Sequence, residues 1–400
     1  MNKVSVLSML SLLILSILAG CNDINDYSTN PSHRLAFSVD TLSFDTIFSS
    51  VGSTTGQFMI YNPNDEALTI ESVVLANAGK SGFRINVDGR KGDSFQGIDI
   101  WKKDSLYVLV EVTVNPNGAN QPFIVEDSIL FYTNGLRQSV LLQAYGQNVH
   151  LIKGGVTFTK DTTLVSDLPY LVYDSILVSE GATLTVEKGA IFYLHNSTNL
   201  IVSGTLKAKG TQDEPVIFRG DRLDVIQANV LLPYDRTPGQ WGGMYFNSTS
   251  FGNEFDYVIV RNGSSGLTFR ESEPDRLKID IRNSQITNMD KNLLTATNAH
   301  IEASNSEFSN SSGSIAALVG GKYRFTHCTL ANYKVIGNIR DINSPCLLLA
   351  NEVEVDKEKK FYALQQAWFE NCIIDGNFSA DTTHQFRGEI LLYTNDEKPE

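Results

Sequence analysis

Short runs of alternating apolar and polar residues fill the chain from about residue 35 to residue 150. Segment 35–44, LAFSVDTLSF, alternates, and 56–76 reads as two such runs around the turn Asn-Pro-Asn-Asp at 62–65. Asp88-Gly89 is a tight-turn pair. Alternation with period two is typical of half-buried strands. About seven strands with a turn signal every 10 to 15 residues predict an antiparallel β-sandwich over 35–150.

From residue 151 the pattern changes to short apolar strands that stop at Gly or Asn and then recur at a fixed interval. RNSQITN begins at 282, SNSEFSN at 304, THCTLAN at 326 and ENCIIDG at 370, so the intervals are 22, 22 and 44 residues. The second residues of these segments, and of the earlier DYVIVRN, are Asn283, Asn305, His327, Asn371 and Tyr257. A fixed period of this length is the signature of a solenoid with one repeat per coil.

A second strand recurs within each repeat, at 266, 292, 314 and 346, so the double interval is a coil that carries an insertion. The charged segment 354–366 is the predicted extruded loop. Equivalent inward residues of a solenoid stack on one another. We therefore expect an inward ladder of small residues, Val258, Ser284, Ser306, Cys328 and Cys372, and an aliphatic ladder of Ile286, Phe308, Leu330 and Ile374.

Three phrases in the solenoid region resemble the entry coils of right-handed parallel β-helices of the pectate-lyase-like superfamily. They are Gly181-Ala182-Thr183-Leu184, Val202-Ser203-Gly204-Thr205-Leu206 and Glu214-Pro215-Val216-Ile217-Phe218. The preceding FMIYNPNDEALTI, from residue 58, is similar to immunoglobulin-like domains of the major sperm protein and Hydin type. The expected fold is all-β: an immunoglobulin-like β-sandwich followed by a right-handed parallel β-helix over 151–400.

The N-terminus has one Lys, then an apolar run too short to span as a mature helix, and ends in Leu18-Ala19-Gly20-Cys21. This resembles the lipobox of bacterial lipoproteins, which implies a signal peptide over 1–20 and a diacylglycerol on Cys21. Segment 21–34 is then a polar tether, and Asp23 and Asp26 are similar to the acidic tract of surface-exported Bacteroides-type lipoproteins. The resemblance implies a bacterial outer-membrane protein, anchored by its N-terminal lipid and exposed at the surface.

Composition narrows the range of partners. The chain has 400 residues, 42% of them hydrophobic and 19% charged, with a net charge of −13. The hydrophobic fraction is that of a folding chain, and the negative charge argues against nucleic acid as a partner. A glycan or another envelope protein is the partner that we expect.

Apart from Cys21 the cysteines are Cys328, Cys346 and Cys372. Cys328 and Cys372 fall on adjacent coils, so they could form a disulfide or remain stacked, buried thiols. No Cys/His spacing suits zinc, and the six histidines are scattered, so we predict structural histidines, no metal site and no cofactor.

The pectate-lyase-like fold hosts polysaccharide lyases, polygalacturonases and pectin esterases, but the sequence motifs of these enzymes do not occur in this chain. Acidic turns at 221, 270 and 288 are the segments that could bind a cation or a sugar. This pattern favours a non-catalytic binding or structural role, with no catalytic residue assigned. A polysaccharide-acting lyase or hydrolase of the same superfamily is the alternative.

An Asp followed by Ser or Thr and then an aliphatic residue or Thr recurs along the chain, and this resembles the O-glycosylation motif of Bacteroides-type envelope proteins. The candidate acceptors are Thr41, Thr46, Ser105, Ser128, Thr162, Ser175 and Thr382. The same pattern also arises where an Asp turn begins a β-strand, and the sequence leaves both interpretations open.

Overall fold

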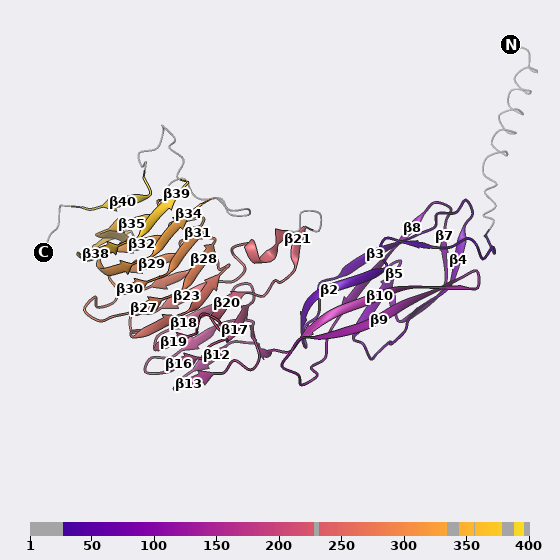
Figure 1. Ribbon diagram of the computed structural model, residues 1–400, viewed down its shortest axis with the longest axis horizontal. Coiled ribbons are helices and arrows are strands. Elements are labelled where there is room, and N and C mark those ends of the chain that lie inside the picture. Colours follow the sequence, from indigo (N-terminus) through magenta and orange to yellow (C-terminus); the bar gives the residue numbers. More distant parts are fainter. Residues whose placement is uncertain (1–26, 228–231, 334–343, 356, 378–387, 396–400) are drawn as a thin grey trace, which may run out of the picture. The chain divides into compact units, whose positions relative to one another are not determined.

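The computed structural model describes residues 27–227, 232–333, 344–355, 357–377 and 388–395. The chain forms two compact units, whose strands are labelled in Figure 1. The first unit holds the described residues up to Pro116 together with Pro122–Gly146, and the second holds Asn117–Gln121 and the described residues from Gln147 onward. Among the described residues, no helix is long and apolar enough to cross a membrane.

The first unit is a β-sandwich of two five-stranded sheets. One sheet has the order β1 (Ala36–Phe37), β3 (Gly56–Tyr61), β8 (Ser105–Val112), β5 (Phe83–Val87) and β6 (Arg90–Gly92). The other has the order β2 (Thr41–Phe48), β10 (Leu136–Gln147), β9 (Phe123–Thr133), β4 (Leu68–Leu75) and β7 (Ser94–Ile100). Their inward side chains form one core, in which Phe58 of β3 meets Phe131 of β9 edge-on at 6.4 Å.

The described part of the sandwich thus has ten strands, more than the seven that the alternation predicts. The segment 35–44 is not one strand, because β1 pairs with β3 whereas β2 pairs with β10 in the other sheet. The short β6 lies at an edge of its sheet and is exposed throughout. A strand of two or three residues is too short to show a period-two pattern.

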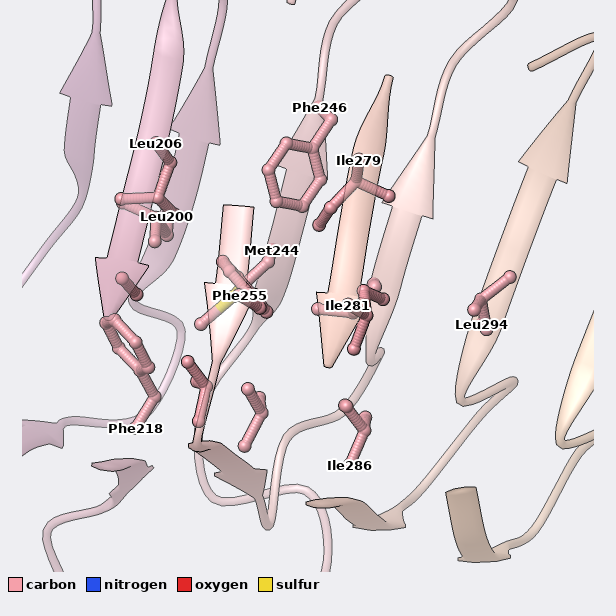
Figure 2. Close-up of a cluster of buried hydrophobic side chains, with 14 of the residues drawn as sticks. Leu200, Leu206, Phe218, Met244, Phe246, Phe255, Ile279, Ile281, Ile286 and Leu294 are labelled. Carbon is pink, nitrogen blue, oxygen red and sulfur yellow. The ribbon is translucent and has the colours of Figure 1, made fainter. Parts of the chain in front are cut away.

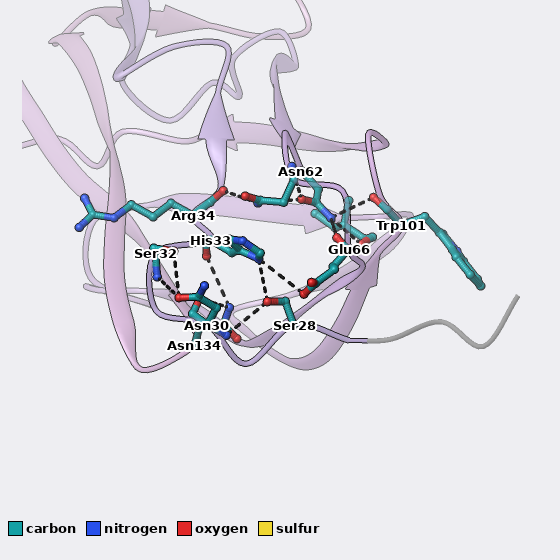
Figure 3. A network of polar contacts seen from close by, with 11 residues as sticks. Ser28, Asn30, Ser32, His33, Arg34, Asn62, Glu66, Trp101 and Asn134 are labelled. Carbon is teal, nitrogen blue, oxygen red and sulfur yellow. Dashed lines mark hydrogen bonds and ion pairs between the residues drawn. The ribbon is translucent and has the colours of Figure 1, made fainter.

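Residues 27–34, expected as tether, lie against the sandwich. Tyr27 forms a parallel bridge with Ala67, and the Ser28 amide donates to the Ala67 carbonyl at 2.9 Å. Figure 3 shows the contacts that continue this attachment: His33 Nδ1 lies 2.7 Å from Ser28 Oγ, and the Asn134 side chain donates to the Asn30 carbonyl at 3.0 Å. Polar composition alone could not separate a tether from a segment whose polar groups are satisfied by a domain.

The second unit is a parallel β-helix whose three sheets are named first, second and third in the order in which each coil visits them. The first sheet contains β11 (His150–Ile152), β14 (Tyr170–Val172), β17 (Ile191–Leu194), β20 (Val216–Gly220), β25 (Val258–Arg261), β28 (Gln285–Met289), β31 (Glu307–Ser311), β34 (Thr329–Asn332) and β39 (Ile373–Gly376). The second contains β12 (Val156–Phe158), β15 (Ile176–Val178), β18 (Asn199–Val202), β23 (Gly243–Phe246), β26 (Leu267–Phe269), β29 (Leu294–Thr297), β32 (Ala316–Val319), β35 (Leu347–Ala350) and β40 (Ile390–Tyr393).

The third sheet contains β13 (Thr162–Leu164), β16 (Thr183–Val186), β19 (Thr205–Lys209), β24 (Asn253–Asp256), β27 (Ile279–Arg282), β30 (His300–Ser304), β33 (Gly321–Thr326) and β38 (Leu364–Glu370). The fold class predicted from the sequence is confirmed. Side chains from all three sheets fill the interior, and Figure 2 shows Leu200, Phe246 and Ile281 among them. Each coil buries its apolar side chains on the coils above and below, which is what makes a repeat stable.

Backbone conformation explains the segment that recurs from coil to coil, such as RNSQITN at 282 and SNSEFSN at 304. Its second residue has a positive φ in every copy, at Tyr257, Asn283, Asn305, His327 and Asn371, with φ between 49° and 55°. These residues make the corner between the third and first sheets. Because Asn tolerates the left-handed region better than most residues do, it recurs at this corner.

Both predicted inward ladders are present. The strand register aligns Ile286 with Phe308, Leu330 and Ile374 in turn. The ladder of small residues also has a polar role, because the Val258 amide donates to Ser284 Oγ at 3.0 Å and the Ser284 amide donates to Ser306 Oγ at 3.1 Å.

The insertion after β35 differs from its predicted bounds of 354–366. It is a hairpin of β36 (Glu352–Val355) and β37 (Glu358–Phe361). Residues 364–366 instead begin β38, which pairs with β33 in the third sheet. A second insertion, between β20 and β23, contains β21 (Val225–Gln227), β22 (Leu232–Pro233) and the short 3-10 helix η1 (Tyr234–Arg236).

Candidate functional site

An open groove of about 1100 Å³ follows one corner of the β-helix. Apart from Thr205, the first residue of β19, its lining comes from the connections between the second and third sheets in five consecutive coils, the second to the sixth. Because every lining segment occupies the same place in its coil, the groove runs along the stack. We call it the corner groove; its residues are Glu180, Gly181, Gly204, Thr205, Ser248, Thr249, Phe251, Arg270, Glu271, Ser272, Glu273, Pro274, Arg276 and Asn298.

Unequal connection lengths create the hollow. The connection has two residues in the third coil, 203–204, and two in the sixth, 298–299, but six in the fourth, 247–252, and nine in the fifth, 270–278. The short third-coil connection is fixed by packing. A Cβ at Gly204 would lie 2.1 Å from the Ala182 carbonyl oxygen, so only glycine fits there.

Hydrogen bonds between coils hold the fourth-coil wall. Thr249 Oγ1 donates to the Ser203 carbonyl at 2.8 Å, and Thr205 Oγ1 donates to the Phe251 carbonyl at 3.0 Å. The fifth-coil wall is attached to later coils: the Asn298 side chain donates to the Ser272 carbonyl at 3.2 Å. Both walls are therefore parts of the folded stack, each held to a neighbouring coil by side-chain hydrogen bonds.

Charge in the corner groove is mixed. Glu180, Glu271 and Glu273 contribute carboxylates, and Arg270 and Arg276 contribute guanidinium groups. The Arg276 guanidinium lies 3.8 Å from the Phe251 ring centroid, a cation–π contact. Burial, followed by hydrogen bonding to Glu271, raises the pKa of Tyr362 to about 12, so this tyrosine stays protonated beside the groove.

A buried lysine lies next to the groove. Lys278 is fully buried, and its Nζ donates to the Asn247 carbonyl at 2.8 Å and lies 5.0 Å from the Phe251 ring centroid. Burial, with a smaller contribution from the charge of Arg276, lowers the pKa of Lys278 to about 8. The lysine thus connects the fourth-coil and fifth-coil walls at a cost in desolvation.

Of the three acidic turns expected from the sequence, only the one at 270 contributes to the groove. Asp221 and Asp224, from the turn at 221, are paired with His195 (2.6 Å) and Arg222 (2.7 Å). In the turn at 288, the Asn288 side chain donates to Asn262 Oδ1 at 2.8 Å. The segment at 221 follows β20 and the segment at 288 starts at the end of β28, both in the first sheet and at another corner of the β-helix, so the structure does not bring all three together.

The His195–Asp221 pair forms a second polar cluster. The Tyr173 and His195 ring centroids are 4.3 Å apart, and the Asp221 side chain is 11% exposed. Burial, followed by the charge of Asp221, raises the pKa of Tyr173. A carboxylate in this position fixes the orientation of an imidazole.

No group of three or more His, Cys, Asp or Glu side chains in the described part of the chain could hold a metal ion.

Sequence reasoning missed Glu180, Thr205, Phe251, Lys278 and Asn298. The repeat did contain a signal, since all except Thr205, the first residue of β19, belong to connections between the second and third strands of successive coils. Only the register of the stack shows that these connections meet, and that register becomes certain only with the strand pairing.

The cysteine and glycosylation candidates are placed as follows. Cys328 and Cys372 are free thiols at stacked positions, because the next residues, Thr329 and Ile373, pair with each other. None of the six described acceptor candidates is buried, and Thr382 lies outside the described residues. At Thr46, Ser105 and Ser128 the preceding Asp accepts a hydrogen bond from the acceptor residue's own amide. Of these three only Ser105 begins a strand, β8, and fits the strand-starting role of Asp, because Thr46 and Ser128 lie inside β2 and β9.

No family model matches the chain, and no curated protein matches it either. Solved structures similar to parts of the chain include a family 123 glycoside hydrolase from Clostridium perfringens, at 9% identity and a TM-score of 0.20. That match covers 28% of this chain and 26% of the hydrolase, so the chain spans about a quarter of the hydrolase's length.

Two further structures match about a third of the chain. A PapD-like domain of human CEP192 is 10% identical and the periplasmic chaperone SfaE is 15% identical, each with a TM-score of 0.20. Each match covers 32% of this chain, together with 94% of the CEP192 domain and 66% of the chaperone. At these scores the likenesses carry no information about activity, and any function has to be argued from the geometry.

Proposed function

We propose that this chain is a lipid-anchored protein of the bacterial outer membrane whose β-helix binds a glycan in the corner groove without cleaving it. The observation that supports glycan binding is the shape of the groove, which crosses five coils along the stack. Neighbouring parallel strands lie about 4.8 Å apart, so five coils span roughly 19 Å. A groove of that length suits a chain-like ligand better than a compact small molecule.

The lining chemistry also suits a sugar chain. Sugars offer many hydroxyl groups that both donate and accept hydrogen bonds, and a lining of carboxylate, guanidinium, amide and hydroxyl groups can satisfy them. Phe251 adds an apolar surface of the kind that sugar rings contact. Hydrogen bonds between coils hold the backbone of the walls, so the connections do not have to become ordered on binding.

The lipid anchor is proposed from the sequence at Leu18-Ala19-Gly20-Cys21, and Cys21 lies outside the described residues. Diacylation of Cys21 with a further acyl chain on the new amino group would give stable attachment, because one chain alone binds a membrane only marginally. The net charge of −13 agrees with a partner other than nucleic acid.

A glycan-array screen on soluble protein that starts at Asn22 tests the proposed binding. We expect selective binding of one polysaccharide class that is lost in the double variant Arg270→Ala/Arg276→Ala. The matched control is Arg90→Ala, which removes an exposed arginine of the sandwich. An array without a hit, or equal binding by the double variant, would show that the corner groove is not the glycan site.

Polysaccharide cleavage at the same groove is the second candidate, because three glutamates line it and paired carboxylates are the usual catalytic groups of glycosidases. The array hits would be incubated with the protein, and reducing ends and the absorbance of unsaturated uronates followed. Product that disappears in Glu271→Gln or Glu273→Gln would replace the binding role with an enzymatic one. Binding without product would support the non-catalytic role.

A further inference from the structure

The chain enters the sandwich at the end where β4 begins and β7 finishes. Tyr27 bridges Ala67, directly before β4, and the Tyr27 hydroxyl donates to Asp99 Oδ2 at 3.1 Å, near the end of β7. The side chain of Asn62 donates to the Glu66, Ile100 and Trp101 carbonyls at 2.9 to 3.1 Å. The entry point and the loop after β7 are thus fastened to each other.

Trp101 is exposed at this same end. Half of its surface is accessible, and Figure 3 shows its indole pointing away from the polar network. Its backbone is fixed, because its carbonyl accepts from the Asn62 side chain at 3.1 Å and from the Asp104 amide at 3.2 Å. A large aromatic side chain is therefore held in water on a rigid turn.

The surroundings of Trp101 combine aromatic and charged groups. Tyr27 is 43% exposed, Lys102 is exposed, and Lys103 pairs with Asp65 at 3.1 Å. Asp65, Glu66, Asp99 and Asp104 outnumber Lys102 and Lys103, so this end does not carry the positive charge that attracts anionic lipids.

The short segment between Cys21 and Tyr27 limits how far the Trp101 end of the sandwich can lie from a membrane. Five residues, 22–26, separate Cys21 from Tyr27. Six Cα-to-Cα steps span at most about 22 Å when fully extended. If Cys21 carries lipid, as the proposed function holds, the end of the sandwich that bears Trp101 stays within that distance of the bilayer surface.

We infer that Tyr27 and the loop 101–103 form a membrane-contact surface, with the Trp101 indole in the headgroup layer of a zwitterionic bilayer. Trp and Tyr favour this layer because one part of each ring is apolar and the other forms hydrogen bonds. Lys102 can extend its stem along the surface while its ammonium stays in water. The contact is weak by itself and depends on the anchor, which keeps the loop at a high effective concentration near the lipid.

Tryptophan fluorescence tests this contact. The chain from Cys21, with Cys372→Ser and Trp368→Phe, is coupled through Cys21 to a maleimide lipid in phosphatidylcholine vesicles that carry brominated acyl chains. Only Trp101 and the fully buried Trp241 then emit. We expect a blue shift and quenching of the Trp101 emission in the vesicles, and both effects should be absent when Trp101→Phe leaves Trp241 alone.

Unchanged Trp101 emission on vesicles that carry the protein would overturn the inference. So would an effect that needs anionic lipid, or a blue shift that appears in solution as protein concentration rises, since the latter would identify a second copy as the partner. Chemical coupling makes this test independent of natural acylation. The mass of the protein extracted from bacterial membranes tests the acylation separately, so the two proposals can fail independently.

Discussion

At the residue scale, Lys278 is the buried group whose effect on the free energy of unfolding is easiest to measure. Its ammonium is buried and donates to the Asn247 carbonyl, no carboxylate among the described residues pairs with it, and its pKa falls from 10.5 to about 8. A base with a lowered pKa in the folded state destabilises the fold wherever the unfolded state holds that base protonated. The penalty is complete below pH 8 and disappears as the pH rises toward 10.5, because the unfolded state then binds more protons.

We expect Lys278→Met to raise the free energy of unfolding by on the order of 2 kcal/mol at pH 7, since an apolar residue of similar length removes the buried charge. The gain over the parent should shrink between pH 8 and pH 10.5. Urea titrations at several pH values measure it. Lys188→Met is the control, because that lysine is exposed and its pair with Glu214 is a surface pair of small value. A pH-independent gain, or a loss, would contradict the desolvation argument.

Single residues also show which features of the fold could be predicted from the sequence. Asn283, Asn305 and Asn371 mark the corner by the conformation that Asn tolerates, so the coil period was visible without a structure. Tyr257 takes the same positive φ against its intrinsic preference, because the coils on either side impose it, and His327 takes it as well. Lys278 gave no signal, since an isolated lysine in a sequence is normally a solvated one.

At the element scale, the corner groove depends on how long the connection between the second and third sheets is in each coil. Strands repeat and can be aligned by pattern, whereas connections differ from coil to coil and have no period. The sequence therefore predicted the stack and its ladders, yet it could not show that two long connections in neighbouring coils help to line a groove. The same limit explains the hairpin at 352–361, whose bounds depend on where β38 resumes pairing with β33.

Replacing Glu271–Leu277 by Asn-Ala, the connection of the sixth coil, should leave the β-helix folded and abolish glycan binding. The register supports this graft, because Ile279 pairs with Ile301, which follows the sixth-coil connection by the same step. Circular dichroism and thermal melting would report the fold, and binding of the array hit would report the groove.

The control for this graft shortens the β36–β37 hairpin, replacing Val353–Lys360 by Asn-Gly, since that hairpin does not line the groove. We expect it to retain binding. A graft that folds and still binds the glycan, or a hairpin deletion that abolishes binding, would place the ligand elsewhere on the molecule.

At the scale of the whole molecule, the Cys328–Cys372 pair decides how the last coils are held together. The two residues stack at the strand spacing of about 4.8 Å, within the Cα separation that a disulfide needs. They enclose the eighth coil, with the 43 residues 329–371 between them. Closing a loop of that length stabilises the fold by about 4 kcal/mol in the chain-entropy model.

Protein exported to the oxidising cell envelope should therefore carry this disulfide, whereas protein made in the cytoplasm should have three free thiols in the mature domains. Thiol titration in denaturant, with peptide mass mapping, distinguishes the two forms. The exported form should melt at a higher temperature than Cys372→Ser, and reduction should remove the difference. Cys346→Ser serves as the control, because Cys346 donates to the Leu330 carbonyl and does not belong to the stacked pair. Three reactive thiols in exported protein would mean that Cys328 and Cys372 act only as packing groups. Burial would then explain the missing disulfide, because it raises the pKa of Cys328 to about 11 and slows oxidation of that thiol.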